Sequence, residues 1–481
     1  MDKLAVVLYP SPAIGHLVSM VELAKLLLAH HHSLHAHILL TTPPYQVGKT
    51  TPYLDSATAA AAAGGLSLTF HPLPVISAPL NPSSSAYPES LSFELLRLNI
   101  PNVRRAILSI SHHHSVRALI FDLFCASALD LATDLGIPGY SFMSSGAGIV
   151  ACFLHLPQLH RTITESFKDL SVDLHLPGLP PIPCSDMVSP LQDRNDRAYE
   201  WFLDASIKMG KSAGIVVNTF EALEARAVKA VSDGICVADG PTPPIFCVGP
   251  IIAGDDGRGW GGECLTWLDS QPSRSVVFLC FGSLGVFSRE QLREIALGLE
   301  GSGTRFLWVV RSPPAGEGEG EGPRTTSSPD PDPDLERVLP AGFVERTRGR
   351  GLVVWSWAPQ AAVLRHGAVG GFVTHCGWNS VLEAVCAGVP MAAWPLYAEQ
   401  RFNRVIMAEE MKVAVRMEES GKGWVGAAEV ERRVREVMGT GEGRAVRERV
   451  AAMKGAAEAA RRDGGSSGLA VSRFVESWIP K

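Results

Sequence analysis

The chain has 481 residues, which is too long for one hydrophobic core, so we expect two domains of roughly 200 to 250 residues each. Hydrophobic residues make up 46% of the sequence and charged residues 19%, the balance of an ordinary globular protein. A net charge of −6 gives no reason to expect nucleic acid or an anionic membrane surface as a partner. These bulk properties fit a soluble protein, which we expect to be a monomer.

The cysteines and the apolar stretches bear on the compartment. Nine cysteines are scattered along the chain without a C-x-x-C pair, so we expect reduced, mostly buried thiols in a reducing compartment. A short apolar run follows Met1-Asp2-Lys3 without the long apolar region of a signal peptide, and no stretch approaches the ~18 to 20 apolar residues of a membrane span. We therefore expect a cytoplasmic protein without a membrane span.

In the first half of the chain, apolar runs alternate with helical patterns. The apolar runs predict buried strands at 4–9, 118–122 and 214–218. Helical patterns follow them at 17–28, from 127 onward and at 221–231. Continuous apolar strands separated by amphipathic helices predict a parallel sheet covered on both faces.

The second half repeats this alternation after a break. Residues 251–262, IIAGDDGRGWGG, are rich in glycine and predict a linker. Strands are expected at 275–281, 305–310, 352–355 and 370–374, and helices at 288–301, 359–364 and from 378 onward. The sequence therefore predicts an α/β protein of two doubly wound, Rossmann-like domains, 1–250 and 263–465.

Residues 312–334, SPPAGEGEGEGPRTTSSPDPDPD, contain no large apolar side chain and are crowded with glycine, proline and acid. They cannot bury enough surface to offset the entropy lost on ordering, so we predict a mobile surface loop. Asp330, Asp332 and Asp334 resemble a metal-binding aspartate motif, but alternating prolines in such a loop cannot form a closed coordination shell. We interpret the run as a solvated linker and expect no metal site.

The most informative segment is 357–400. In it the apolar strand at 370–374 leads through the turn 375–377 into a helix that begins near Trp378. Such a junction directs several backbone N–H groups at one point, which suits a phosphate, and the first turn of the helix holds no carboxylate to repel it. Side chains around the turn can reach hydroxyl groups or offer a flat face to a base: Trp357, Asn379, Ser380 and Glu383. Together these parts fit a nucleotide that carries a sugar.

A histidine and an aspartate at strand ends are the candidates for proton transfer. His16 follows a glycine-containing turn at the start of the first helix, and Asp122 ends the apolar strand at 118–122. Ligands of such sheets bind outside the carboxyl ends of the strands, so we expect both residues at that edge. A neutral imidazole can take a proton from a phenol, and a carboxylate can hold its tautomer. On the residues alone, a helix-capping histidine and an aspartate N-cap for 125–130 remain alternatives.

The 44 residues from 357 to 400 resemble, without a gap, the nucleotide-sugar signature of plant family 1 UDP-glycosyltransferases. Residues 8–16, LYPSPAIGH, resemble the amino-terminal loop of that family, and 281–283, FGS, its second phosphate loop. The resemblance covers essentially the whole chain and is weakest at 76–105 and 180–205, where the family recognises acceptors. It implies the GT-B fold, in which two domains face each other across a cleft and a last helix, here 466–481, packs back on the first domain.

The resemblance also implies a role for each matching residue. His16 falls on the position of the catalytic base and Asp122 on that of its carboxylate partner. Contacts to the donor are implied for Ser144, Ser283, Trp357, Ala358, Gln360, His375, Gly377, Trp378, Asn379, Ser380, Glu383, Glu399 and Gln400. No cofactor or metal is implied, because the charge of the departing UDP falls on the helix N-terminus at 377–380. Direct attack on C1 of an α-linked UDP-sugar gives a β-glycoside with inversion.

Two positions indicate the donor sugar. Gln400 stands where the resembled family has Gln in members that use glucose and often His in members that use galactose. Trp378 stands where members that use UDP-glucuronic acid tend to have Arg, which pairs the carboxylate. We therefore expect UDP-glucose as co-substrate. A flat aromatic acceptor is expected to occupy an apolar pocket lined by Phe93, Phe124, Phe142, Tyr199, Phe202, Leu396 and Tyr397.

Residues 9–27, YPSPAIGHLVSMVELAKLL, and 281–288, FGSLGVFS, resemble the branch of the family that glycosylates flavonoids, chalcones and related phenols. We therefore expect transfer of glucose to a phenolic hydroxyl. C-glucosylation of a chalcone- or phloroglucinol-like ring is an alternative, because deprotonating a phenol also makes its ortho carbon more nucleophilic. A UDP-sugar-binding protein without catalysis is the alternative from another class, although the intact His16 and Asp122 argue against it.

Overall fold

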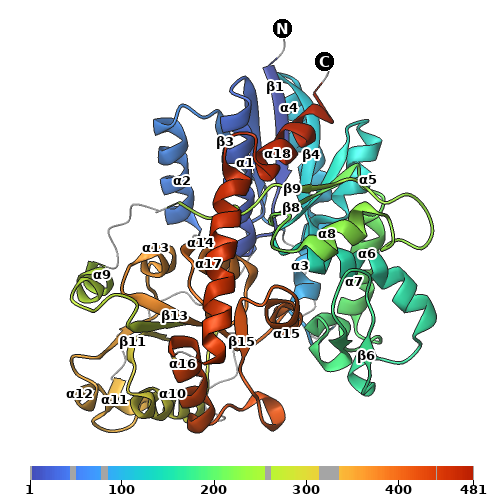
Figure 1. Cartoon of the computed structure of the whole chain (residues 1–481). Coiled ribbons are helices and arrows are strands. Elements are labelled where there is room, and N and C mark those ends of the chain that lie inside the picture. The colour runs from blue at the N-terminus through green and yellow to red at the C-terminus, as the bar shows by residue number, and fades with distance from the viewer. Residues whose placement is uncertain are drawn as a thin grey trace. The chain divides into compact units, whose positions relative to one another are not determined.

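The computed structural model describes residues 3–43, 50–76, 85–254, 262–313, 335–439 and 441–479. The chain divides into two compact units: unit 1 comprises Met1–Asp256 and Ala457–Lys481, and unit 2 comprises Gly257–Ala456 (Figure 1). Most of the predicted linker at 251–262 lies outside the described residues. So does nearly all of the predicted loop at 312–334, including its three aspartates.

Unit 1 is built on a seven-stranded parallel sheet in the order β3-β2-β1-β4-β5-β8-β9. Its strands are β1 (Lys3–Tyr9), β2 (Leu34–Leu40), β3 (Leu68–Pro72), β4 (His114–Asp122), β5 (Gly139–Met143), β8 (Gly214–Val217) and β9 (Ile245–Cys247). A separate antiparallel pair is formed by β6 (Asp173–Leu174) and β7 (Ile182–Pro183). The strand order reverses direction between β1 and β4, which makes this edge the topological switch point, where ligands of doubly wound sheets bind.

Helices cover both faces of this sheet. They are α1 (Ile14–His30), α2 (Thr51–Ala63), α3 (Glu89–Leu98), α4 (Ile100–Ser111), α5 (Ala128–Asp134), α6 (Ala147–Thr162), α7 (Arg197–Met209), α8 (Ala225–Ser232) and α18 (Ser466–Glu476). One face is packed by α1 and α18, through residues such as Val21 and Phe474. The other is packed by α4 through Val103 and Ile107.

Unit 2 is built on a six-stranded parallel sheet in the order β12-β11-β10-β13-β14-β15. Its strands are β10 (Val276–Cys280), β11 (Arg305–Val310), β12 (Gly351–Trp355), β13 (Val369–Thr374), β14 (Met391–Ala393) and β15 (Ala414–Arg416). The strand order reverses between β10 and β13, so the two predicted phosphate loops, 281–283 and 375–377, follow the two strands of the switch point.

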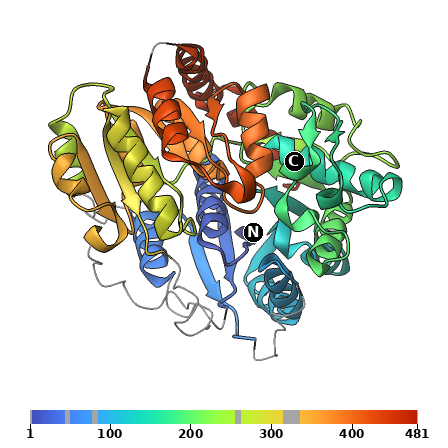
Figure 2. The ribbon, with the colours of Figure 1, turned by 90° about the horizontal axis from the view of Figure 1, so that it is seen from below.

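The helices of unit 2 lie along the strands of their own sheet (Figure 2). They are α9 (Gly262–Asp269), α10 (Arg289–Ser302), α11 (Leu335–Val338), α12 (Phe343–Arg346), α13 (Gln360–Arg365), α14 (Trp378–Ala387), α15 (Gln400–Val405) and α16 (Ala427–Met438). Helices α10 and α16 approach so closely that a Cβ on Gly298 would lie 2.6 Å from Val430 Cβ. Trp308 and Trp394 are fully buried in the core of this unit.

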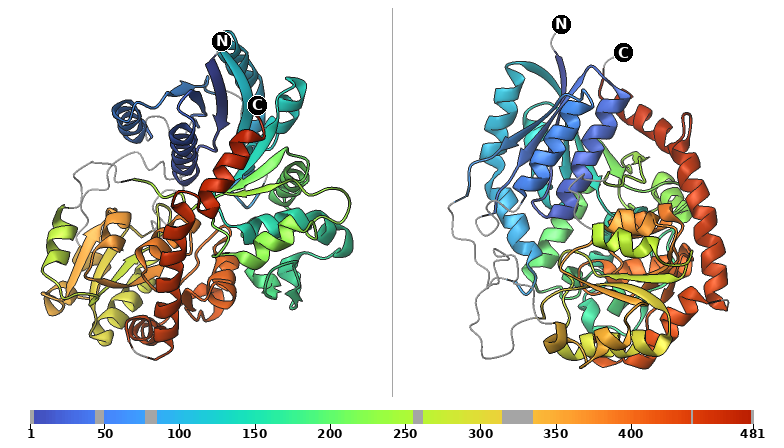
Figure 3. Two further views of the ribbon diagram at one scale, coloured as in Figure 1. Left: turned by 45° about the horizontal axis from the view of Figure 1, so that its top comes forward. Right: turned by 90° about the vertical axis from the view of Figure 1, so that its left-hand side faces the viewer.

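The boundary between the units falls within α17 (Glu442–Arg461), which leads through a short turn into α18 (Figure 3). Phe474 of α18 meets Tyr140 at 4.9 Å and Phe246 at 5.2 Å between ring centroids, within the core of unit 1. The fold-class prediction of two doubly wound parallel-sheet units is confirmed. No helix among the described residues is long and apolar enough to cross a membrane.

Candidate active site

The structure brings His16 and Asp122 together at the switch point of unit 1. His16 lies in the first turn of α1, which follows β1, and Asp122 is the last residue of β4. His16 Nδ1 and Asp122 Oδ2 are 2.7 Å apart, and the side chains are 29% and 1% exposed. When the buried carboxylate accepts the Nδ1–H, the lone pair of the neutral imidazole is on Nε2. This is the arrangement of a general base with an orienting carboxylate.

Asp122 also caps a helical turn. Its Oδ1 accepts a hydrogen bond from the backbone N–H of Phe124 at 3.1 Å, at the start of the 3-10 turn Leu123–Cys125. Partner of His16 and N-cap were alternatives on sequence grounds. The cap lies at 123–125 and not at the expected 125–130, because α5 begins at Ala128. One carboxylate oxygen serves each role, so the two interpretations are compatible.

Ser144 lies beside this pair. It follows β5, and its Oγ is 3.3 Å from His16 Nδ1. The structure therefore places Ser144 next to the candidate base within unit 1. Its expected contact with the donor stays a prediction.

Aromatic rings stand next to the imidazole. The ring of Phe124 meets that of His16 edge-on, with centroids 5.4 Å apart. Phe93 of α3 lies 4.8 Å from Phe124 and 5.1 Å from Phe202 of α7, and Trp201 stacks on Phe93 at 5.8 Å. We call Phe93, Phe124, Trp201 and Phe202 the aromatic wall; its apolar faces beside a base suit a flat phenol.

The other residues expected around the acceptor have contacts of their own. Phe142 is fully buried in the core cluster beneath α1 and α18, because its strand position points it to that face. The guanidinium of Arg194 lies over the Tyr199 ring, 5.7 Å from the ring centroid. The Tyr199 hydroxyl is 3.2 Å from His160 Nδ1. Leu396 and Tyr397 belong to unit 2. The structure thus places only Phe93, Phe124 and Phe202 of the predicted set in the aromatic wall.

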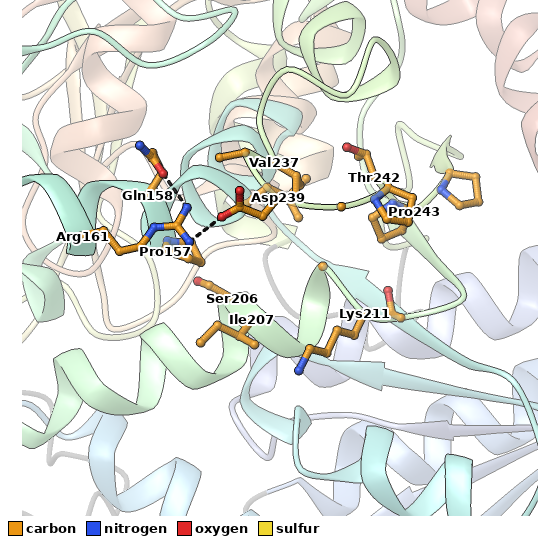
Figure 4. A pocket seen from close by; sticks show the side chains of 17 residues that line it. Pro157, Gln158, Arg161, Ser206, Ile207, Lys211, Val237, Asp239, Thr242 and Pro243 are labelled. Atoms are coloured by element: carbon orange, nitrogen blue, oxygen red, sulfur yellow. Dashed lines mark hydrogen bonds and ion pairs between the residues drawn. The ribbon is translucent and has the colours of Figure 1, made fainter.

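A cavity of about 590 Å³ in unit 1 lies apart from these residues (Figure 4). It is lined by the C-terminal turns of α6 and α7 and by the segment 237–244. Arg161 and Asp239 form an ion pair of 2.6 Å at this cavity. None of the predicted site residues lines it, so it is not the predicted acceptor pocket.

In unit 2, His375 packs into the two turns that follow β10 and β13. Gly282 has a positive φ of 73°, and an added Cβ there would lie 2.5 Å from His375 Nε2. An added Cβ on Gly377, which precedes α14, would collide with the same nitrogen. Burial lowers the pKa of His375 to about 4, so the ring is neutral at pH 7. We expect it to serve a phosphate as an N–H donor and not as a cation.

Beside this turn lies a polar group suited to a nucleoside. Gln360 Nε2 donates to Ser380 Oγ at 2.8 Å and to Glu383 Oε2 at 2.7 Å, and burial raises the pKa of Glu383. Trp357 is 45% exposed, so its ring is open to a stacked base, whereas Trp378 is buried. Ala358 is buried, Asn379 and Glu399 are half-buried, and Ser283 is exposed.

Gln400, the first residue of α15, is held by the backbone segment just before that helix. Its Oε1 accepts hydrogen bonds from the backbone N–H groups of Leu396 at 2.9 Å and Tyr397 at 3.0 Å. Both lone pairs of the amide oxygen are therefore used inside the protein, and the NH₂ group is what remains for a sugar. We therefore expect Gln400 to contact a sugar hydroxyl through its NH₂ group, as a donor.

Sequence reasoning missed Arg311, which follows β11. Its Nη1 donates to the carbonyl oxygen of Ser283. Burial raises the pKa of Tyr397, and the positive charge of Arg311 partly offsets that rise. A guanidinium is thus placed beside the second phosphate loop. The sequence did offer a signal for this residue: an arginine stands directly after the strand RFLWVV. That strand, β11, pairs with β10, one of the two strands of the switch point.

No group of three or more His, Cys, Asp or Glu side chains that could hold a metal ion occurs within the described ranges. Asp330, Asp332 and Asp334 lie outside those ranges. The expected independence of metal therefore stays a prediction.

Comparisons with known proteins show the family of this chain. The family model described as UDP-glucoronosyl and UDP-glucosyl transferase matches residues 257–438. UDP-glycosyltransferase 88B1 of Stevia rebaudiana is 48% identical over 482 residues, which cover 100% of both chains. Anthocyanidin 5,3-O-glucosyltransferase of a Rosa hybrid cultivar is 48% identical over 490 residues, 99% of each chain. The structure of Phytolacca americana UGT2 complexed with UDP-2fluoro-glucose and pterostilbene is 39% identical, covers 98% of this chain and 99% of that one, and has a TM-score of 0.86.

Two doubly wound units, one with a histidine–aspartate pair and the other with a turn expected to bind phosphate, define a glycosyltransferase of the GT-B fold. The likeness to relatives over the whole chain goes further. The chain belongs to the plant UDP-glycosyltransferase family, as the resemblance of residues 357–400 predicted, and it is an enzyme that uses a UDP-sugar.

Proposed function

We propose that this enzyme transfers glucose from UDP-glucose to a hydroxyl group of a flavonoid, chalcone or related phenol, giving a β-O-glucoside with inversion. The observation that carries the proposal is the 2.7 Å contact between His16 and Asp122 beside the aromatic wall. The rose relative is named for anthocyanidin, and the Phytolacca structure contains pterostilbene; both are phenols.

In this mechanism His16 removes the proton of the phenol. Its Nε2 lone pair takes the proton, while Asp122 holds the Nδ1–H and stabilises the imidazolium as it forms. The phenolate oxygen attacks C1 of α-linked UDP-glucose, the bond from C1 to the UDP oxygen breaks, and UDP departs. Inversion at C1 follows from this single displacement.

The charge of the departing UDP falls on the N-terminus of α14, the neutral His375 and the loop at 282–283. Arg311 adds a positive charge beside that loop. These groups can stabilise the leaving phosphate without a metal ion, so we propose that turnover needs none and that UDP-glucose is a co-substrate with no further cofactor.

We further propose that the enzyme acts in the cytoplasm as a monomer. None of the nine cysteines, all of which lie within the described residues, forms a disulfide, and eight of them are buried, which fits a reducing compartment. Light scattering on the purified protein tests the oligomeric state, and microscopy of a fluorescent fusion tests the compartment.

A screen of UDP-glucose against a panel of phenols, read by mass spectrometry, tests the reaction. We expect a mass gain of one hexose on a flavonoid or chalcone, and acid hydrolysis that releases the aglycone. A product that survives hydrolysis would show C-glucosylation and replace the proposed O-glucoside. Binding of UDP without any transfer would show a protein that has lost catalysis.

A further inference from the structure

Glu224 is a buried carboxylate that reaches the start of a neighbouring helix in unit 1. It is 2% exposed and lies between β8 and α8. Its Oε1 accepts a hydrogen bond from the Gly148 N–H at 2.8 Å, and its Oε2 accepts from the Ala147 N–H at 2.8 Å. The hydroxyl of Thr219 donates to Oε2 at 2.5 Å. Both oxygens are therefore committed to contacts within the protein.

These contacts replace a cap that the local sequence lacks. Ala147 and Gly148 open α6, whose N-cap is Gly146, a residue without a side chain to accept their N–H groups. The first N–H groups of a helix have no partner within the helix, and the helix dipole favours an anion there. A residue 77 positions further along the chain supplies that anion.

The capped helix start adjoins the candidate base. The turn 144–146 connects β5 to α6, and at its first residue Ser144 Oγ lies 3.3 Å from His16 Nδ1. A helix N-terminus at the carboxyl end of a strand is where doubly wound domains commonly bind phosphate. In unit 1 the carboxylate of Glu224 occupies the helix start where a phosphate would bind. The turn 144–146, which precedes this helix start, contacts His16 through Ser144.

We propose that Glu224 is a positioning residue for the transfer reaction: by capping α6 it holds the turn 144–146 in place, so that Ser144 and Asp122 together fix the orientation of the His16 imidazole. The inference rests on the proposed function, in which His16 is the base. A cap that serves stability alone is the alternative, and the experiment separates the two.

The test compares Glu224→Gln with Glu221→Gln, an exposed glutamate three residues earlier in the same segment. The amide of Gln has nearly the same shape as the carboxylate, but one of its two terminal atoms is a donor, so one of the helix N–H groups loses its acceptor. We expect Glu224→Gln to lower kcat on the order of 10- to 100-fold, as a small misplacement of a catalytic group does. The affinity for UDP stays unchanged, because the phosphate-binding residues lie in unit 2. Glu221→Gln retains wild-type kcat.

The deciding measurement is the titration of His16, followed by NMR on histidine-labelled protein without substrates and assigned with His16→Gln. We expect Glu224→Gln to move the His16 titration midpoint and the pH profile of kcat/KM in the same direction, and the loss in kcat to be largely absent in a Ser144→Ala background. An unchanged His16 titration with a lowered melting temperature would show a purely structural cap and overturn the proposal. If Glu224→Gln does not fold, the same measurements are made on Glu224→Asp, whose carboxylate is one methylene group shorter. A shifted His16 titration again supports the proposal, and an unchanged titration with a lowered melting temperature again overturns it. The titration needs no turnover, so failure of the proposed function appears separately, as a wild-type enzyme that glycosylates no phenol.

Discussion

At the scale of single residues, the side chain of Asp122 has two roles: it holds His16 and it caps a helical turn. Oδ2 faces His16 Nδ1 and Oδ1 accepts the Phe124 N–H, so both oxygens must be acceptors. In Asp122→Asn one of these positions becomes an NH₂ group, which faces an N–H donor or turns the imidazole to its other tautomer. The histidine and the turn therefore both depend on acceptor oxygens of this one side chain.

We predict that His16→Ala lowers kcat by about 10² to 10⁴-fold, as removal of a general base does, and that Asp122→Asn lowers it less. UDP affinity, measured by calorimetry, should be unchanged in both, because the residues expected to bind the phosphates lie in unit 2. Initial rates with UDP-glucose and a phenol accepted by the wild type give the comparison. Most of the wild-type kcat surviving in His16→Ala would remove His16 from the mechanism.

Gln400 offers a second test at this scale, because its two terminal atoms have separate tasks. Gln400→Glu keeps an oxygen for the N–H groups of Leu396 and Tyr397 but replaces the NH₂ donor, whereas Gln400→Met loses both. We predict that Gln400→Glu keeps the wild-type melting temperature and UDP affinity and loses roughly 1 to 3 kcal/mol in kcat/KM for UDP-glucose, the range for an unpaired polar group. Gln400→Met should also lower the melting temperature.

The same residue bears on donor choice. UDP-glucose should exceed UDP-galactose and UDP-glucuronic acid in kcat/KM, since the neutral, buried Trp378 offers no partner for a carboxylate. Competition between the three donors, followed by mass spectrometry, gives the ranking directly. Equal rates with UDP-galactose and UDP-glucose would mean that Gln400 does not distinguish the two sugars.

At the scale of elements, the strand-to-helix junction of unit 2 depends on glycines that leave room for His375. We predict that Gly282→Ala weakens UDP binding by tenfold or more, because its Cβ would lie 2.5 Å from the ring and φ is +73°. The positive φ alone costs on the order of 1 kcal/mol in stability. Gly367→Ala is the matched control, since a Cβ there meets nothing within 4 Å. Wild-type UDP affinity in Gly282→Ala would show that His375 does not have to stay in this position.

Elements with a strong local signal could be predicted from the sequence, and others could not. The strand at 305–310 was predicted to the residue, because FLWVV is a continuous apolar run that follows Arg305 near a helix end and precedes a polar segment. The predictions missed β2, LHAHILL, because two histidines interrupt its apolar pattern, and β14, which has only three residues.

In the candidate site, too, some residues could be predicted from the sequence and others could not. His16 and Asp122 could be found because Asp122 ends β4 and His16 lies at the start of the helix after β1, and β1 and β4 are the two strands of the switch point. Nothing in the segment NTFEALE tells which glutamate is buried, since the partners of Glu224 lie 76 and 77 residues away. The sequence likewise could not show that Phe142 points into the core, because that depends on which face of β5 is covered by α1 and α18.

At the scale of the whole molecule, a group of histidines links stability to pH. His35 and His37 of β2, His71 of β3 and His114 of β4 lie on one face of the unit 1 sheet, with ring centroids 4.8 to 5.1 Å apart. His37 Nδ1 and His71 Nε2 are 2.9 Å apart, so one neutral ring donates to the other. Burial, followed by the neighbouring His71, His114 and His35, lowers the pKa of His37 to about 4. Burial and His114 also lower the pKa of His35 and His71, with Lys3 adding to the effect on His35.

Because these pKa values are lowered in the folded state, the stabilising contribution is complete above pH 6.5 and is lost as the pH falls below it, when the unfolded chain binds protons that the folded one excludes. A shift of His37 from 6.5 to about 4 corresponds to at most about 3 kcal/mol of folding free energy, lost progressively between pH 6.5 and 4. We predict that the free energy of unfolding, from urea titrations at pH 7.5 to 4.5, falls more steeply in the wild type than in His37→Leu. The exposed His113, replaced by Leu as a control, should leave the wild-type slope unchanged. Equal slopes in the wild type and His37→Leu would show that this cluster does not set the acid limit of the enzyme.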